Sequence, residues 1–236
     1  MTAYGGAASS VPSMRPEDRV RLGKMTNPVR GILHGTAAVA FLVAIIVLIA
    51  VTPGGVPRRI ALVAFGLGLV GLFTVSSLYH SVPWRPAVKQ WMQRVDHTMI
   101  YVLIAGTFTP IAAIVLDGWL RIATLVVQWG IVAVGATEKL TRPVPSRNLS
   151  IALQTTQGWL AMFLLWPLAS RLPWTALLLI GLGGLLYTVG MVFLVTNRPR
   201  LWPRVFSYHE LFHVFVVTAS VVHFTAAYRY VVPLAA

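Results

Sequence analysis

Long apolar stretches, separated by short polar or basic segments, dominate the chain after residue 30. A helix needs about 20 mainly apolar residues to cross the hydrocarbon core of a bilayer. Seven stretches approach this length, at 31–51, 60–79, 99–116, 119–136, 151–167, 174–196 and 208–230. The pattern predicts an all-α membrane protein, a seven-transmembrane helix bundle. The third and fourth stretches are short and meet at Asp117-Gly118, so a single re-entrant hairpin is the alternative for this pair.

The first 26 residues differ from the rest, because they are small, polar and basic and contain no apolar core segment. A cleavable signal peptide requires such a segment and is not predicted. We expect a flexible cytoplasmic tail over 1–26 and a transmembrane domain over 27–236.

The composition agrees with a membrane protein. Of the 236 residues, 57% are hydrophobic and 11% are charged, whereas a soluble domain has about 25% charged residues. This balance excludes a disordered chain and argues against a soluble one. Cysteine is absent, which excludes disulfides, thiolate metal ligands and a cysteine nucleophile.

The net charge of +13 indicates the orientation of the chain in the membrane. Cytoplasmic loops of membrane proteins carry an excess of Lys and Arg. With the N-terminus in the cytoplasm, most basic residues fall on the inner side: Arg15, Arg19, Arg21, Lys24, Arg30, Arg85, Lys89, Arg94, Lys139, Arg142, Arg147, Arg198, Arg200 and Arg204. The outer side has Arg58, Arg59, Arg121, Arg171 and Arg229. This predicts a multi-pass plasma membrane protein with a cytoplasmic N-terminus and an outer C-terminus. Nucleic-acid binding, which basic charge can also indicate, is not expected.

The ionisable residues gather at one end of the predicted spans. The inner ends contain His34, His80, Asp96, His97, His209, Glu210 and His213. Only His223 lies about 15 Å deeper, at 1.5 Å per helical residue. Ionisable groups within spans are costly and usually face an interior site. For any single residue, the alternative is a place in the headgroup belt.

The spacing of three histidines predicts a metal site. His209 and His213 are four residues apart, so both imidazoles leave one face of a helix, and His80 could supply a third ligand. Three histidines leave one coordination position for water, as in catalytic zinc sites. Zinc lowers the pKa of such water to about 7. Asp96 could then act as base or acceptor, and Ser76 could donate to the water or to a substrate carbonyl.

The segment from His209 to His213 also matches the H-E-x-x-H pattern of zinc proteases, in which the glutamate is the general base. His223 does not fit the longer spacing to a third ligand in that class. A zinc protease therefore remains a minor alternative. Glu210 leaves the helix about 100° away from His209, so we expect it to cap the helix or to pair with a basic loop.

Two segments carry a resemblance to a known family. SSLYHSVPWRPAVKQWMQRVDHTMIYVLIAGTFTP at 76–110 and HELFHVFVVTASVVHF at 209–224 closely resemble the hemolysin III family, in its bacterial form. That family is related to the progestin and adiponectin receptors. The resemblance implies their seven-span core and buried zinc.

The resemblance places zinc ligands on His80, His209 and His213, the acid that orients the zinc-bound water on Asp96, and the motif serine on Ser76. The chain departs from the family pattern in one place. Many members have an asparagine four residues before the first-span histidine, whereas this chain has Arg30 before His34.

Three functions are compatible with these features. The first is a zinc-dependent hydrolase of lipid amide or ester bonds, with membrane lipids as environment and substrate. The second is a non-enzymatic membrane-homeostasis or receptor-like protein with structural zinc. The third, a pore-forming cytolysin implied by the family name, has less support, because the spans show no polar stripe through the bilayer.

Overall fold

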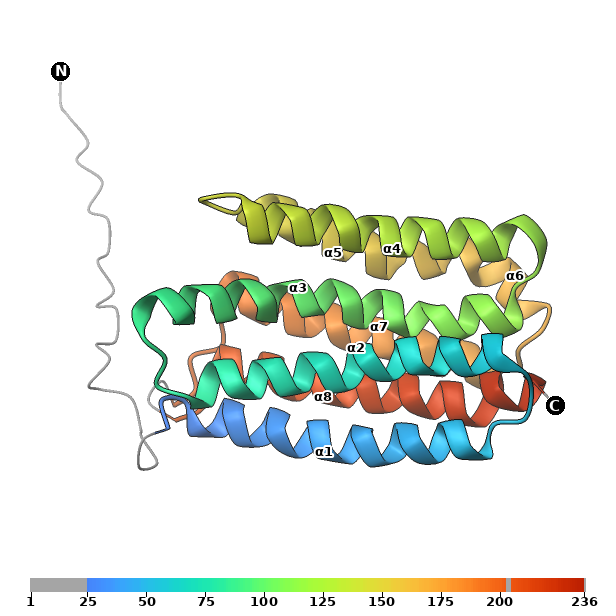
Figure 1. The fold of residues 1–236 in the computed structure, drawn as a ribbon, viewed down its shortest axis with the longest axis horizontal. Helices are drawn as coiled ribbons and strands as arrows, with labels where there is room; N and C mark the ends of the chain where they lie inside the picture. Colours follow the sequence, from blue (N-terminus) through green and yellow to red (C-terminus); the bar gives the residue numbers. More distant parts are fainter. Residues whose placement is uncertain (1–24, 203–204, 236) are drawn as a thin grey trace, which may run out of the picture.

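The computed structural model describes residues 25–202 and 205–235, and these fold into a bundle of antiparallel helices (Figure 1). No strand is present in this part of the chain, so the predicted all-α class is confirmed. The long helices are α1 (Pro28–Val51), α2 (Val56–Ser81), α3 (Pro86–Pro110), α4 (Gly118–Thr141), α5 (Arg147–Trp159), α7 (Trp174–Thr196) and α8 (Tyr208–Ala226). Shorter segments are η2 (Ile111–Val115), η3 (Leu160–Leu164), α6 (Leu165–Ala169), η4 (Ala227–Val231) and η5 (Val232–Ala235).

Six helical runs within the described residues are long and apolar enough to cross a membrane. They are Pro28–Val51, Val56–Ser81, Pro86–Val115, Gly118–Thr141, Trp174–Thr196 and Tyr208–Leu234. The third and fourth are each long enough alone, which favours two separate spans over the re-entrant hairpin. The predicted segment at 151–167 is broken into α5, η3 and α6, and none of these pieces is long enough by itself.

The third span begins earlier than the apolar pattern indicated. We expected it from residue 99, but α3 begins at Pro86, and its first turns contain Lys89, Arg94 and Asp96. Proline suits the first turn of a helix because its missing N–H is not needed there. Hydropathy alone cannot detect these polar turns as helix.

The helices pack as two groups around α3. In the first group, α2 packs between α1 and α3, and α8 packs against α1 and α7. In the second group, α4 and α5 cover the other side of α3 (Figure 1). Phe41, Phe65, Leu69 and Phe73 are among the buried side chains of the first group. Many apolar side chains point outward, such as Val39 and Leu67, as expected for lipid-facing surfaces.

Two glycines bring α2 and α3 into close contact. A Cβ atom on Gly106 would lie 2.8 Å from the carbonyl oxygen of Ala64, and one on Gly68 would lie 3.0 Å from that of Val102. Small residues allow this approach of helix backbones. The two helices are antiparallel, so two turns further along α2 the same register places Ser76 opposite Asp96.

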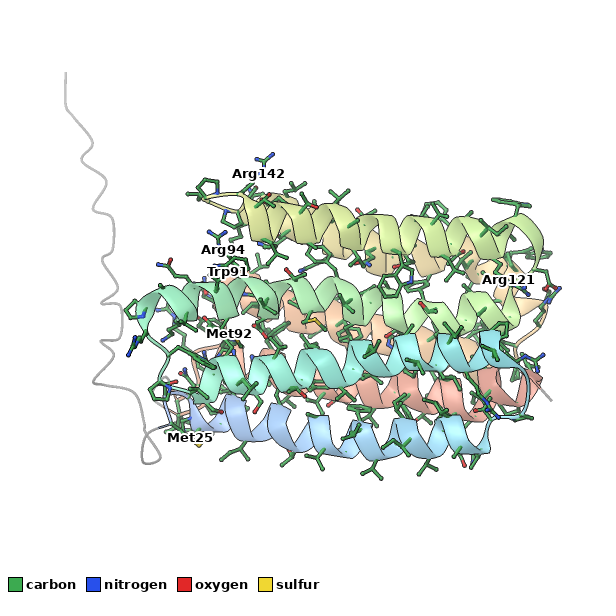
Figure 2. The ribbon with its side chains drawn as sticks, viewed as in Figure 1. Met25, Trp91, Met92, Arg94, Arg121 and Arg142 are labelled. Carbon is green, nitrogen blue, oxygen red and sulfur yellow. The ribbon has the colours of Figure 1, made fainter. Side chains whose placement is uncertain are left out.

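The two ends of the bundle are held by different polar contacts. At the end where α1 and α8 begin and α2 stops, here called the histidine end, Arg94 donates to the carbonyl oxygens of Arg142 and Pro143, both at 2.9 Å. At the opposite end, Asp117 pairs with Arg121 at 2.9 Å and with Arg171 at 2.5 Å. Figure 2 shows Arg94 and Arg142 at one end and Arg121 at the other.

Candidate metal centre

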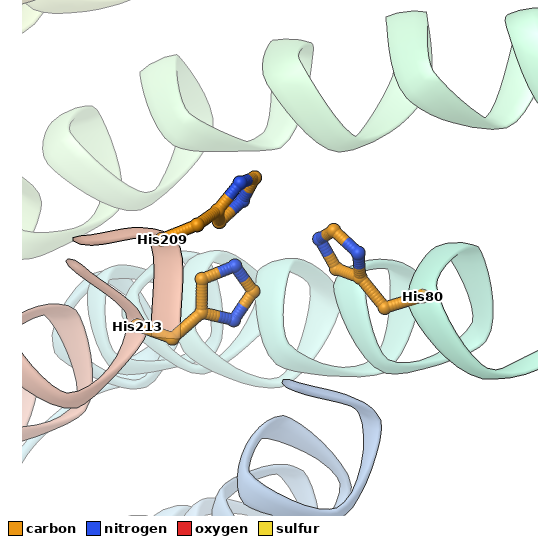
Figure 3. A group of neighbouring side chains, drawn as sticks. All are labelled: His80, His209 and His213. Carbon is orange, nitrogen blue, oxygen red and sulfur yellow. The ribbon is translucent and has the colours of Figure 1, made fainter. Parts of the chain in front are cut away.

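His80, His209 and His213 come together at the histidine end of the bundle. His80 lies in the last turn of α2, and the other two lie in the first turns of α8. One ring nitrogen from each lies within 4.8 Å of the others (Figure 3). The ring centroid of His80 lies 5.3 Å from that of His209 and 4.9 Å from that of His213. The structure therefore brings together the three predicted ligands.

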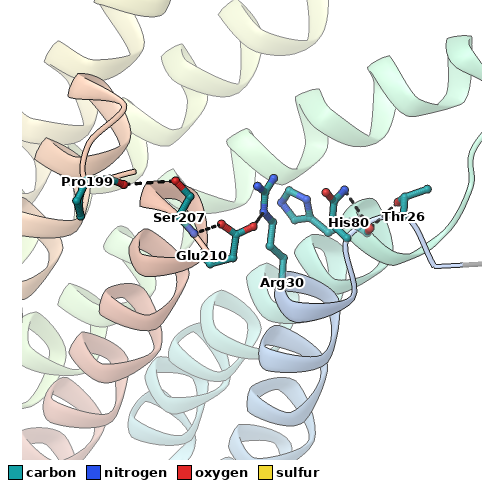
Figure 4. A network of polar contacts seen from close by, with 7 residues as sticks. Thr26, Arg30, His80, Pro199, Ser207 and Glu210 are labelled. Atoms are coloured by element: carbon teal, nitrogen blue, oxygen red, sulfur yellow. Dashed lines mark hydrogen bonds and ion pairs between the residues drawn. The ribbon is translucent and has the colours of Figure 1, made fainter. Parts of the chain in front are cut away.

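A capping contact and an ion pair set the start of α8. The backbone N–H of Ser207 donates to Oε2 of Glu210 at 2.8 Å, the arrangement of a capping box. The other oxygen of Glu210 accepts from Nε of Arg30 in α1 at 2.6 Å (Figure 4). The expectation that Glu210 caps or pairs is thus confirmed. Because both its oxygens are engaged, the arrangement argues against the protease alternative.

The end of α2 is fixed from the start of α1. The carbonyl oxygen of His80 accepts from Oγ1 of Thr26 at 2.7 Å and from the backbone N–H of Asn27 at 3.0 Å (Figure 4). Carbonyls in the last turn of a helix lack partners within the helix. These contacts supply one, and they hold the backbone that carries the His80 imidazole.

The donor set fits zinc. His80 and His213 are buried, with 3% and 2% of their surface exposed. Nε2 of His80 and Nδ1 of His213 have no hydrogen-bond partner among the described residues. Buried polar atoms are normally paired, so these atoms call for a ligand. In tetrahedral zinc, ligand nitrogens are about 3.4 Å apart, which small rotamer changes can reach from 4.8 Å.

Asp96 and Ser76 form a buried pair close to the histidines. The hydroxyl of Ser76 is a polar neighbour of the Asp96 carboxylate, and the two residues are 2% and 7% exposed. Oδ1 of Asp96 has no hydrogen-bond partner in the part of the chain that the structure describes. Ser76 precedes His80 by four residues, so the pair lies about 6 Å deeper along α2. All five predicted site residues thus occupy one region.

The remaining histidines fall in three different environments. His34 stacks on His213 within the centre, with centroids 4.0 Å apart. His97 is half-buried on α3, with Lys139 of α4 as a charged neighbour. His223 lies away from the centre, where its Nε2 contacts the carbonyl oxygen of Ile180 at 3.1 Å. The position of His34 in the sequence places it at the same end of the bundle as the three candidate ligands, but it gives no sign of the contact with His213.

Comparisons with known proteins identify the family of the chain. A family model described as "Haemolysin-III related" matches residues 23–224. Hemolysin-3 of Bacillus cereus is 32% identical over 206 residues, which cover 86% of this chain and 91% of that protein. The Hemolysin-3 homolog of Bacillus subtilis is 30% identical over 203 residues, covering 85% and 92%.

A human protein, monocyte to macrophage differentiation factor, is 25% identical over 178 residues, which cover 70% of this chain and 68% of that protein. The family match and the apolar helices agree with a multi-pass protein of the plasma membrane. The chain belongs to the hemolysin III family of integral membrane proteins.

Proposed function

We propose that this protein is a zinc-dependent hydrolase of lipid amide or ester bonds, with its site at the inner leaflet. The observation that carries the proposal is the combination of three imidazoles, with ring nitrogens within 4.8 Å of one another, and a buried carboxylate that keeps one oxygen unpaired. Such an oxygen is suited to accept a proton from water.

We also propose seven crossings with the histidine end in the cytoplasm. Arg147 at the start of α5 donates to the carbonyl oxygen of Val195 near the end of α7 at 3.0 Å, whereas Arg171, just after α6, pairs with Asp117 at the opposite end. The run from α5 to α6 therefore extends along the bundle (Figure 1). The histidine end has the larger share of basic residues, which favours the cytoplasm.

The roles of the chain's own residues follow from their positions. His80, His209 and His213 would hold the metal. When bound there, zinc supplies Lewis acidity and makes a water molecule more acidic. Asp96 accepts a proton from the attacking water through Oδ1, as the new carbon–oxygen bond forms at the substrate carbonyl. It then returns this proton to the amine or alcohol that leaves when the carbon–nitrogen or ester carbon–oxygen bond breaks.

Ser76 has a narrower role than its spacing suggested. We expected it to donate to water or to a substrate carbonyl, and the Asp96 carboxylate is a polar neighbour of its hydroxyl. In this proposal it fixes the orientation of the Asp96 carboxylate and leaves Oδ1 to face the reacting water.

Lipids are the substrate class that the surroundings favour. The centre lies about one helical turn inside an apolar bundle, and apolar side chains on the outer faces of α1 and α2, such as Val39 and Leu67, are exposed. A carbonyl group just below the headgroups is at matching depth, because the hydrocarbon core of the bilayer begins there.

Zinc content and lipid hydrolysis, measured together, test the proposal. The wild type and His209→Ala are purified in nanodiscs, their zinc per chain is measured, and each is given fluorescent amide and ester lipids. We expect one zinc per wild-type chain, product release, and the loss of both in the variant. Negligible zinc in both proteins would contradict the proposal. Zinc without hydrolysis would support the structural role instead, and vesicle leakage that does not depend on zinc would support a pore.

A further inference from the structure

A second polar cluster lies between α3, α4 and α5, on the other side of α3 from the metal centre. Gln128 of α4 and Gln157 of α5 are 1% and 0% exposed. On α5, Ser150, Gln154 and Gln157 are all buried, and their spacing places them on one helix face. This face turns polar groups toward the interior of a membrane bundle.

Hydrogen bonds fix the orientation of both glutamine amides. Nε2 of Gln157 donates to the backbone carbonyl oxygens of Tyr101 at 3.1 Å and of Gln128 at 3.3 Å. Nε2 of Gln128 donates to the carbonyl oxygen of Gln157 at 3.1 Å. If either amide were rotated by 180°, its oxygen would face a carbonyl oxygen. The positions of both Oε1 atoms are therefore determined by the helix backbones.

Both Oε1 atoms lack a donor. They are buried, and no described residue donates to Oε1 of Gln128 or of Gln157. In a membrane interior, where bulk water is absent, an unpaired polar atom is especially costly. Buried acceptors of this kind are usually satisfied by ordered water. The cluster therefore calls for a donor in addition to those that the described residues supply.

The charge around the two amides favours water over a cation. The nearest acid along α4 is Glu138, which follows Gln128 by ten residues and so lies about 15 Å away along the helix. Its Oε1 accepts from the backbone N–H of Ser146 at 2.5 Å. Two neutral amide oxygens without a nearby carboxylate give a cation little compensation for its lost hydration. Water, a small neutral donor, suits buried acceptors of this kind.

The polar groups continue from the glutamines toward the histidine end. The ring of Tyr101 lies against Gly135, where a Cβ atom would come within 2.6 Å of it. The phenol group has Ser150 and Glu138 as neighbours. Oε2 of Glu138 is also buried and has no partner among the described residues. The cluster is thus the deep part of a longer polar seam.

We propose that the α3–α4–α5 interface binds internal water at the Oε1 atoms of Gln128 and Gln157, at a site separate from the metal centre. This inference does not depend on the proposed hydrolase activity. It assigns to α5 the role of enclosing hydrated polar groups within the bundle.

A high-resolution structure of the full chain in lipid tests the inference. We expect density about 2.8 Å from each Oε1, with two to four polar neighbours. An absence of density, or amides rotated to new partners, would overturn it. Density about 2.4 Å from five or more oxygens, which changes when sodium is replaced by rubidium, would show a cation and also overturn it.

Gln128→Leu is the matched variant, because it leaves both donor bonds of Gln157 to backbone carbonyls in place. We expect the density to disappear and the melting temperature to fall, while zinc content stays unchanged. Thr155→Val, at an exposed position of α5, is the control and should change neither. A higher melting temperature in Gln128→Leu would show that the amide was unpaired and dry. If this variant does not accumulate in cells, the presence or absence of density near the two Oε1 atoms in the wild-type structure decides whether water is bound.

Discussion

The imidazole of His34 stacks on that of His213, with ring centroids 4.0 Å apart and planes inclined by 24°. Phe73 also makes an edge contact with His34, with ring centroids 4.9 Å apart. His34 is 2% exposed, so α1 supports a candidate metal ligand on α8 through a flat aromatic contact. A metal site depends on such supporting residues as well as on its ligands.

Replacing His34 by alanine should weaken zinc binding without removing any of the three ligands. The change leaves a cavity beside His213, so its ring can leave the orientation needed for coordination. We expect the zinc affinity to fall about tenfold or more, measured by competition with a chromogenic chelator. His34→Phe retains a flat ring and should retain most of the affinity. Equal affinities in the wild type and in His34→Ala would show that the stacking does not matter.

Removing Arg30 should destabilise the histidine end. Its partner Glu210 has only 9% of its side chain exposed, and Arg30 has 16%. Arg30→Met leaves a buried carboxylate without its cation, which typically costs about 3–5 kcal/mol. We expect a clearly lower melting temperature, and partial recovery in the double variant Arg30→Met/Glu210→Gln.

Arg121→Gln is the control for this ion pair. Its bond to Asp117 is exposed, with side-chain exposures of 42% and 59%, and such pairs contribute about 0–1 kcal/mol. The stability of Arg121→Gln should therefore be close to that of the wild type. If the two arginine variants lose the same stability, the Arg30–Glu210 pair does not hold α1 to α8.

The metal site was more predictable from the sequence than its surroundings. His209 and His213 share a face through helix geometry alone, and His80 joins them because α2 stops at the end of the bundle where α8 begins. The Arg30–Glu210 pair joins positions 180 residues apart. The stacking of His34 depends on how α1 is rotated about its axis. Neither relationship leaves a local signal in the sequence.

The glutamine cluster was missed for a related reason. Gln128 and Gln157 are 29 residues apart. Gln128 stands alone in an apolar stretch, whereas Gln157 ends a short polar run that begins at Gln154. Their common environment arises only when α4 and α5 pack on α3. The buried spacing of Ser150, Gln154 and Gln157 was an available signal, since it places polar groups on one face of a predicted span. It corrects the expectation that polar residues gather only at one end.

Gly106→Ala should destabilise the fold through the contact of α2 with α3. The new methyl group would meet the carbonyl oxygen of Ala64, a backbone atom that can move only with its helix. Overpacking of this kind typically costs about 1–3 kcal/mol. Gly184→Ala, where nothing lies within 4 Å, should instead stabilise α7 by about 0.5–1 kcal/mol. Thermal unfolding in one detergent compares the two, and equal effects would argue against the close contact.

Adding zinc to metal-stripped protein should raise its melting temperature, because a ligand that binds only the folded state stabilises it. Zinc at 100 times its dissociation constant contributes about 2.7 kcal/mol. Since imidazole binds metal only when it is unprotonated, the stabilisation should decrease as the pH is lowered. His80→Ala should show almost no response. An equal response in His80→Ala would place the metal elsewhere.

Asp96→Asn separates a catalytic role from a structural one, because Asp96 is not among the three metal ligands. The amide keeps the shape of the side chain and an acceptor for the Ser76 hydroxyl, but it cannot take a proton from water. We expect one zinc per chain and lipid hydrolysis that is about 100 to 10,000 times slower. Ser76→Ala should lower the rate by a smaller factor, about 10 to 100, because the carboxylate survives and only its orientation is lost. Unchanged turnover in Asp96→Asn with full zinc content would leave Asp96 without a catalytic role. Loss of zinc in that variant would instead show that the carboxylate supports the ligands.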